Sequence, residues 1–256
     1  MGRLGLKHLF IFSLLLFLFS WYKYSNNYKL VSDTLSATHA APQQAPLDGP
    51  AAPQSCCKGK YCWTFTPLQT YSAAAVVFGV SHKLASDFDD VMAADAGLLW
   101  GENSARELYK DVKLRVMFDH YDARWDYGVT FNLHEAANTH LASCDEAAFA
   151  AAKNIRPGDQ VRLKGWLVNA VASEKPGETD PYKQLNWKTS LSRTDKGEGA
   201  CELLYLRSPE DVEILERGPR RWFWLKWLGL AGMLLALVQG HRNIKRQLAE
   251  AQKTDW

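Results

Sequence analysis

Residues 156–168 read Arg-Pro-Gly-Asp-Gln-Val-Arg-Leu-Lys-Gly-Trp-Leu-Val and carry the clearest local signal for the fold. Pro-Gly-Asp is typical of a tight turn, and the alternation of apolar and polar residues after it is typical of a half-buried strand. Gly165 lies in the middle of that strand and indicates a bulge or a bend, as the corners of small β-barrels require. The segment therefore predicts a bent strand that leaves a turn.

Several other segments show a strand or helix pattern. Residues 112–118 alternate apolar and polar side chains, and 125–131 follow closely enough to predict a hairpin. Residues 145–153 are rich in Ala and predict one short helix, which Ser143 or Asp145 can cap. The remaining predicted strands are 63–80, 160–171, 185–191 and 202–207. The predicted fold class is mainly β (α+β): a small OB-like barrel or sandwich with one short helix, flanked by two transmembrane helices.

Two apolar stretches, residues 9–22 and 222–239, lie on either side of this region. A helix needs roughly 17–25 mostly apolar residues to cross a bilayer. Both stretches carry Trp at their inner ends, where interfacial aromatic side chains occur. Because no small-residue cleavage site follows the first stretch, the sequence favours an uncleaved anchor over a signal peptide.

The two anchors divide the chain into segments with different environments. The predicted segments are a cytoplasmic tail (1–8), a transmembrane helix (9–22), a proline-rich extended linker (23–60), a soluble β-rich domain (61–216), a second transmembrane helix (222–239) and an amphipathic cytoplasmic tail (240–256). Basic residues are split almost evenly between the terminal tails and the inner flanks of the two anchors. Long segments translocate across a membrane largely regardless of charge, so the short tails count most for the orientation. We therefore expect a two-pass protein of a bacterial inner membrane, with its domain in the periplasm and both termini in the cytoplasm.

The chain between the anchors is mildly acidic. Residues 23–220 contain 22 Lys and Arg residues and 26 Asp and Glu residues, a net charge of −4. A protein that binds nucleic acid usually has a basic surface that matches the phosphate backbone. Nucleic acid is therefore not expected as a partner, although nucleic-acid or oligosaccharide binding by an OB-like barrel stays open as an alternative function.

Cysteine and histidine residues are few. The cysteines are Cys56, Cys57, Cys62, Cys144 and Cys201. In an oxidising compartment four of them would form two disulfides, with a connectivity that the sequence does not give. His134, His140 and Cys144 have a spacing that fits no zinc finger or catalytic zinc helix, so no metal and no cofactor is expected.

The sequence contains no recognisable nucleophile elbow, catalytic triad or phosphate-binding glycine loop. The chain is therefore expected not to be an enzyme. A membrane-tethered hydrolase stays open as a second alternative, and it would need His134 or His140 to meet a carboxylate or a thiol in one pocket.

The second anchor has a face of small residues. Gly229 and Gly232 are three residues apart, and Ala236 follows four residues later, so the three share one side of a helix. Such faces let a second backbone approach closely, which predicts a contact with a protein partner or with a second copy of this chain in the membrane lipid. The alternative is that Gly and Ala are simply frequent in membrane helices.

Residues 83–215 resemble an uncharacterised family of bacterial proteins that often follow a membrane segment. The resemblance is carried by Gly-Leu-Leu-Trp-Gly (97–101), Ala-Asn-Thr-His-Leu (137–141), residues 158–168 and residues 187–206. It covers about half of the chain and implies one domain, but no established activity. The candidate ligand-binding or fold-critical residues are Trp187, Ser190, Arg193 and Asp195 in the longest motif, with Asn138, His140, Trp100 and Trp166.

The two predicted anchors, the proline-rich linker and the lack of a recognisable catalytic motif together favour a binding function. We expect a membrane-anchored extracytoplasmic binding or assembly module that is not an enzyme.

Overall fold

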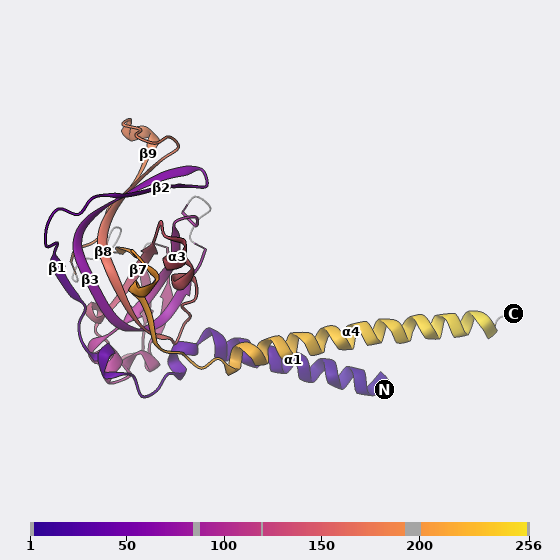
Figure 1. Cartoon of the computed structure of the whole chain (residues 1–256). Coiled ribbons are helices and arrows are strands. Elements are labelled where there is room, and N and C mark those ends of the chain that lie inside the picture. Colours follow the sequence, from indigo (N-terminus) through magenta and orange to yellow (C-terminus); the bar gives the residue numbers. More distant parts are fainter. Residues whose placement is uncertain (1–2, 84–87, 119, 193–200, 255–256) are drawn as a thin grey trace. The chain divides into compact units, whose positions relative to one another are not determined.

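The computed structural model describes residues 3–83, 88–118, 120–192 and 201–254 (Figure 1). The chain divides into two compact units. The helix-pair unit consists of Met1–Asn27 and Pro219–Trp256, and the β-rich unit consists of Tyr28–Gly218. Within the described residues this is a mixed α/β protein with one large β-sheet and four α-helices.

The helices are α1 (Arg3–Ser25), α2 (Gly101–Ala105), α3 (Glu146–Lys153) and α4 (Arg221–Thr254). The strands are β1 (Gln43–Pro46), β2 (Gln54–Lys58), β3 (Tyr61–Ser81), β4 (Met92–Leu99), β5 (Lys113–Val116), β6 (Tyr121–Arg124), β7 (Ala136–Ala142), β8 (Gln160–Ser173), β9 (Gln184–Trp187), β10 (Glu202–Tyr205) and β11 (Val212–Glu216).

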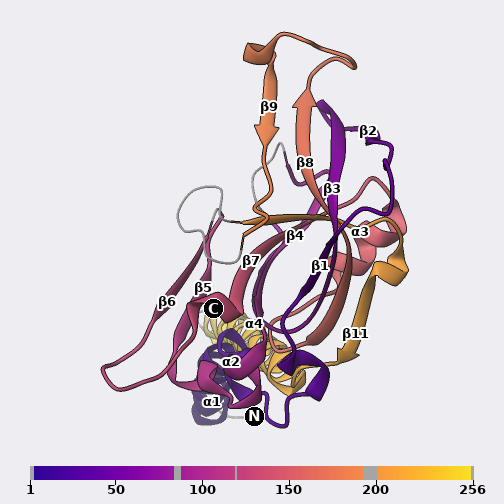
Figure 2. The same ribbon diagram turned by 90° about the vertical axis from the view of Figure 1, so that its left-hand side faces the viewer.

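The long strands β3 and β8 organise the sheet. They pair antiparallel from Cys62 opposite Ser173 to Val76 opposite Gln160, and both curve strongly (Figures 1 and 2). β3 also pairs with β4, β4 with β7, β7 in parallel with β10, and β10 with β8. Following these pairings from β3 therefore leads back to β3.

Gly165 lies where β8 packs closely against β10. A Cβ at this position would overlap the carbonyl oxygen of Tyr205, which belongs to β10. The neighbouring residue Trp166 is paired with Tyr205. Glycine is required here because two backbones approach closely, which is one of the reasons for which strands contain it.

The strands β4 and β7 lie in the middle of the sheet and were not predicted. The segment 137–141, which contains the candidate residues Asn138 and His140, is part of β7, and every residue of β4 and β7 is buried. The alternation of apolar and polar residues that reveals a strand requires one face in water. Both strands are rich in Ala instead, so they carry neither the alternation nor a high β-propensity.

The segment predicted as a proline-rich linker, 23–60, is largely part of the β-rich unit. β1 pairs with residues 69–72 of β3, and β2 forms a hairpin with the start of β3. Thr38 is fully buried, and its hydroxyl lies 2.6 Å from that of Ser104. Pro46 is compatible with β1 because an edge strand leaves some backbone N–H groups without a ladder partner.

Two local predictions have different outcomes. The predicted helix is α3, and the Asp145 carboxylate caps it by accepting from the N–H of Ala148 at 2.7 Å. The hairpin partner of β5 is β6, which precedes the predicted strand 125–131. That prediction was wrong because the turn occupies only residues between Val116 and Tyr121, leaving 125–131 beyond the paired positions.

The helix-pair unit contains two helices that are long and apolar enough to cross a membrane, over Gly5–Ser25 and Arg221–Glu250. α4 continues without a break through the predicted tail 240–256 as far as Thr254. The aromatic rings of Phe19 and Trp222 are 5.5 Å apart. Ser13, nearer the start of α1, lies beside Gly232, further along α4. The two helices therefore pack antiparallel.

Candidate functional site

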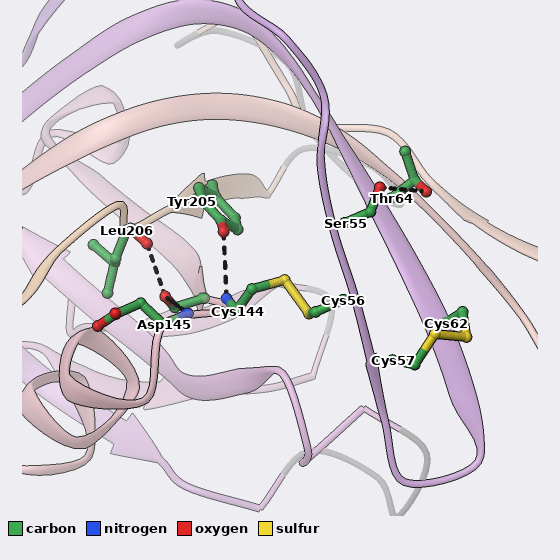
Figure 3. Close-up of a disulfide and its surroundings, with 10 residues drawn as sticks. Ser55, Cys56, Cys57, Cys62, Thr64, Cys144, Asp145, Tyr205 and Leu206 are labelled. Atoms are coloured by element: carbon green, nitrogen blue, oxygen red, sulfur yellow. Dashed lines mark hydrogen bonds between the residues drawn. A yellow bond between two sulfur atoms is a disulfide. The ribbon is translucent and has the colours of Figure 1, made fainter. Parts of the chain in front are cut away.

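Two disulfides fix the edge of the sheet. Cys56 of β2 is bonded to Cys144, which follows β7, and Cys57 is bonded to its cross-strand partner Cys62 (Figure 3). The Cys144 N–H also donates to the hydroxyl of Tyr205 at 3.4 Å. The prediction that four cysteines pair is confirmed, and the fifth, Cys201, is buried. Together with the two apolar helices, the disulfides indicate a membrane protein with an oxidised domain outside the cytosol.

A buried acid–imidazole pair lies at the centre of the sheet. Asp95 of β4 and His140 of β7 are opposite each other in the register, so their side chains are on one face. His140 Nδ1 is 3.4 Å from Asp95 Oδ1, and the two side chains are 0% and 1% exposed. Burying a carboxylate is costly unless it is paired, and the imidazole is a partner for Asp95.

Three aromatic rings lie around this pair, and we call Phe88, Phe118 and Trp187 the three-ring cluster. Their centroids are 5.5 to 6.0 Å apart. The Trp187 ring meets the His140 imidazole edge to face at 4.5 Å. Each ring comes from a different part of the chain: the β3–β4 connection, the β5–β6 turn and β9. Such contacts stabilise by roughly 0.5–1.5 kcal/mol beyond the area they bury.

The neighbouring residues tie these segments to the sheet. The Asn138 amide donates to the carbonyl of Met117 at 2.9 Å, which holds the β5–β6 turn against β7. The Ser190 N–H donates to the carbonyl of Cys201 at 3.0 Å. The Thr189 hydroxyl accepts from the N–H of Leu203 at 2.8 Å, so the segment after β9 is fixed to β10.

The structure thus brings three predicted residues, Asn138, His140 and Trp187, to one region of the sheet, with Ser190 on the segment that follows β9. Arg193 and Asp195 lie outside the described residues. The sequence analysis missed Asp95, Phe88 and Phe118. The signal for Asp95 is that it is the one charged residue in the segment 92–99.

Trp100 and Trp166 serve other parts of the fold. Trp100 is 2% exposed and packs in the hydrophobic core with residues of β3, β4 and β8, at the start of α2. The Trp166 ring is stacked on that of Tyr205, and the Arg207 guanidinium lies 5.3 Å from its centroid. A paired Asp211 carboxylate, 2.8 Å from Arg207 Nη2, holds the guanidinium in place.

Two tyrosines beside these elements have raised pKa values. Burial raises the pKa of Tyr121 to about 12, and the nearby charge of Glu202 contributes to the shift. Burial also raises the pKa of Tyr205, with a smaller contribution from Asp145. Both hydroxyls therefore keep their protons at neutral pH and act as neutral hydrogen-bonding groups.

His134 and His140 occupy different environments. His134 lies in the short 3-10 helix before β7, whereas His140 is the fifth residue of β7. A strand rises about 3.3 Å per residue, so about 13 Å of strand separates His140 from the start of β7. Among the described residues, no group of three or more His, Cys, Asp or Glu side chains is close enough together to hold a metal ion.

A pocket of about 510 Å³ lies beside the β8–β9 hairpin and the start of β3. It is lined by Tyr61, Glu174, Lys175, Glu178, Tyr182, Lys183, Gln184 and Leu185. Tyr182 is 97% exposed. Two carboxylates and two ammonium groups balance the charge of this lining.

The small-residue face of α4 is in contact with α1. A Cβ on Gly229 would lie 2.7 Å from the Phe17 nitrogen, and Gly232 lies against the Ser13 side chain. Ala236 is 5% exposed. Lys226 Nζ lies 4.4 Å from the centre of the Tyr24 ring, a cation–π contact at the start of α4.

Comparison with protein-family models, with curated protein sequences and with solved structures finds no match.

Proposed function

We propose that this chain is a membrane-anchored, non-enzymatic binding or assembly module whose β-rich unit works outside the cytoplasm. The observation that carries the proposal is the three-ring cluster, which gathers aromatic side chains from two separate connections and from β9 beside His140 of β7. Phe118 is 42% exposed, so part of the cluster is accessible. Partly exposed aromatic residues are enriched in protein interfaces, and the net charge of −4 between the anchors disfavours nucleic acid.

In this proposal β3, β4, β7, β10 and β8 form an OB-like barrel. The closed cycle of pairings and the position of α3 between β7 and β8 support it. OB-folds bind ligands on the face of their second and third strands and with the adjoining loops. Of these five strands, β4 and β7 are the second and third in chain order, and they carry Asp95 and His140.

Burial argues against a hydrolase that uses His140. A general base must come within about 2.6–3.2 Å of the proton that it removes. His140 is 0% exposed and lies against Trp187, so a substrate has no access to it in this conformation. The pair formed by Asp95 and His140 is better suited to holding β4 and β7 in one register. The three-ring cluster then packs against this pair through His140.

The binding proposal predicts a cross-link at Phe118. Replacing Phe118 by the photoreactive residue p-benzoylphenylalanine in the full-length chain, in intact cells, is expected to give one discrete protein adduct on irradiation. The same replacement at Tyr182, which is more exposed (97%), should not give that adduct. The adducts are measured by gel shift and mass spectrometry. Identical adducts at both positions, or none at Phe118, would contradict binding at the three-ring cluster.

A second candidate is oligosaccharide binding in the pocket beside the β8–β9 hairpin. It is favoured by the two tyrosine rings and the balanced charges of the lining. Aromatic faces pack against the apolar faces of sugars, and charged side chains bond to their hydroxyl groups. An adduct with a glycan at Tyr182, and none at Phe118, would favour this candidate.

We also propose that the protein is a two-pass protein of a bacterial inner membrane, with the β-rich unit in the periplasm and both termini in the cytoplasm. The antiparallel packing of α1 and α4 supports termini on the same side, and the two disulfides support an oxidising compartment for the domain. In this proposal a protein partner or a second copy would use surfaces of the helix pair that α1 and α4 leave to the lipid.

The topology predicts the activity of inserted reporters. Alkaline phosphatase, which is active only in the periplasm, is expected to be active when inserted after Gly49 and inactive when fused after Trp256. Gly49 suits an insertion because it is exposed and nothing lies within 4 Å of the position of an added Cβ. Phosphatase activity per amount of fusion protein is the measurement, and the opposite pattern would refute the proposed orientation.

A further inference from the structure

The turn that follows β6 exposes aromatic side chains. Residues 125–131, which we call the aromatic turn, project from the β-rich unit in Figure 2. Trp125 is 38% exposed, and Tyr127 is completely exposed. The Trp125 ring packs at 5.5 Å on that of Phe131, and the Val129 N–H donates to the Asp126 carbonyl at 3.2 Å, so the turn has a defined shape.

The base of the aromatic turn is fixed to the first residue of the β-rich unit. The Tyr28 hydroxyl donates to the carbonyl of Val112 and accepts from the N–H of Leu114, both at 3.2 Å. Lys113, between these two residues, pairs with Arg124, the residue before the turn. Phe131 packs against the same core cluster as Tyr28.

The covalent chain keeps this base close to the end of the first anchor. α1 ends at Ser25, and Tyr28 is three residues later. Three residues span at most about 11 Å. The lipid headgroup region is itself about 5–8 Å thick on each side of the hydrocarbon core. Whatever the orientation of the β-rich unit, Tyr28 therefore lies no more than about 11 Å from the end of α1, a distance comparable to the thickness of the headgroup layer.

We propose that the aromatic turn inserts Trp125 and Tyr127 among the lipid headgroups and forms a third attachment of the protein to the bilayer. Trp and Tyr favour this region because their rings are apolar and their N–H and O–H groups remain hydrated. The Arg124 side chain is 78% exposed, and its Nη2 lies 3.5 Å from Asp122 Oδ2. A guanidinium has five N–H donors, so Arg124 can bond to lipid phosphate as well as to Asp122. The inference rests on the membrane anchoring in the proposed function, through α1.

The test places an environment-sensitive fluorophore on single introduced cysteines of the full-length chain in phosphatidylcholine–phosphatidylglycerol nanodiscs. The labelled variants are Asp126→Cys in the turn, Tyr182→Cys as an exposed control, and Leu15→Cys within α1. Asp126 is exposed, and its replacement leaves both aromatic residues in place. We expect iodide to quench the label at Asp126 at least about threefold less than that at Tyr182, and nitroxide-labelled lipid to quench it more.

The three positions separate the possible results. Equal iodide quenching at Asp126 and Tyr182, with Leu15 protected, would overturn the lipid contact and leave the anchoring intact. An accessible Leu15 would overturn the anchoring itself. Adding Trp125→Ser and Tyr127→Ser to the Asp126→Cys variant should restore iodide quenching to the level of Tyr182. Continued protection in that variant would show that the two rings do not make the contact.

Discussion

Replacing Cys56 and Cys144 together by Ser is expected to lower the free energy of unfolding of the β-rich unit by on the order of 4.5 kcal/mol. The disulfide joins residues that are 88 positions apart. A cross-link that closes a longer loop removes more entropy from the unfolded chain. The measurement is denaturant unfolding of the full-length chain in detergent, followed by tryptophan fluorescence without reducing agent.

The matched control is the double variant Cys57→Ser and Cys62→Ser. Its disulfide joins residues only five positions apart, so the same argument gives about 2 kcal/mol. Each variant removes one cysteine of β2 and its disulfide partner. The difference between the two losses of unfolding free energy therefore measures the effect of loop length. Equal losses of stability would refute the chain-entropy explanation for the larger disulfide.

Gly229→Leu is expected to separate α1 from α4. A Cβ at this position would lie 2.7 Å from the Phe17 nitrogen and 2.9 Å from the Ser13 carbonyl oxygen. These are backbone atoms, which cannot rotate away as a side chain can, so we expect a cost of about 1–3 kcal/mol. The measurement is the yield of an oxidative cross-link between Phe19→Cys and Trp222→Cys in membranes, which should fall about tenfold.

The control for this variant is Gly240→Leu in the same helix. Nothing lies within 4 Å of a Cβ at Gly240, so the cross-link yield should not change. If Gly229→Leu leaves the cross-link within the chain intact but abolishes a homodimer, the small-residue face binds a second copy and not α1.

The coarse architecture could be predicted because its signals are local. β8 alternates strongly, the residues 145–153 carry a cap and an Ala-rich run, and the two anchors are distinct in composition. β4 and β7 could not be predicted because burial on both faces removes the alternation. The pairing of β1 and β2 with β3 depends on contacts distant in sequence, which a proline-rich composition does not reveal.

The candidate site was accessible to sequence reasoning only in part. His140 and Trp187 could be selected as residues of distinctive motifs, but their contact depends on the parallel pairing of β7 with β10 and on the return of β9 to β8. Phe88 and Phe118 carry no motif of their own. Their role arises because two unrelated connections converge on the same strands.

The strand order also determines when this domain can fold during synthesis. Cys62 of β3 pairs with Ser173 of β8. This pairing can form only after more than a hundred further residues have been synthesised. The last strand of the sheet, β11, ends at Glu216, and α4 begins at Arg221. The ribosome makes the chain from its N-terminus, so it completes the whole β-rich segment before it begins the second anchor. Insertion of α4 thus acts on a chain that already contains every strand of the sheet.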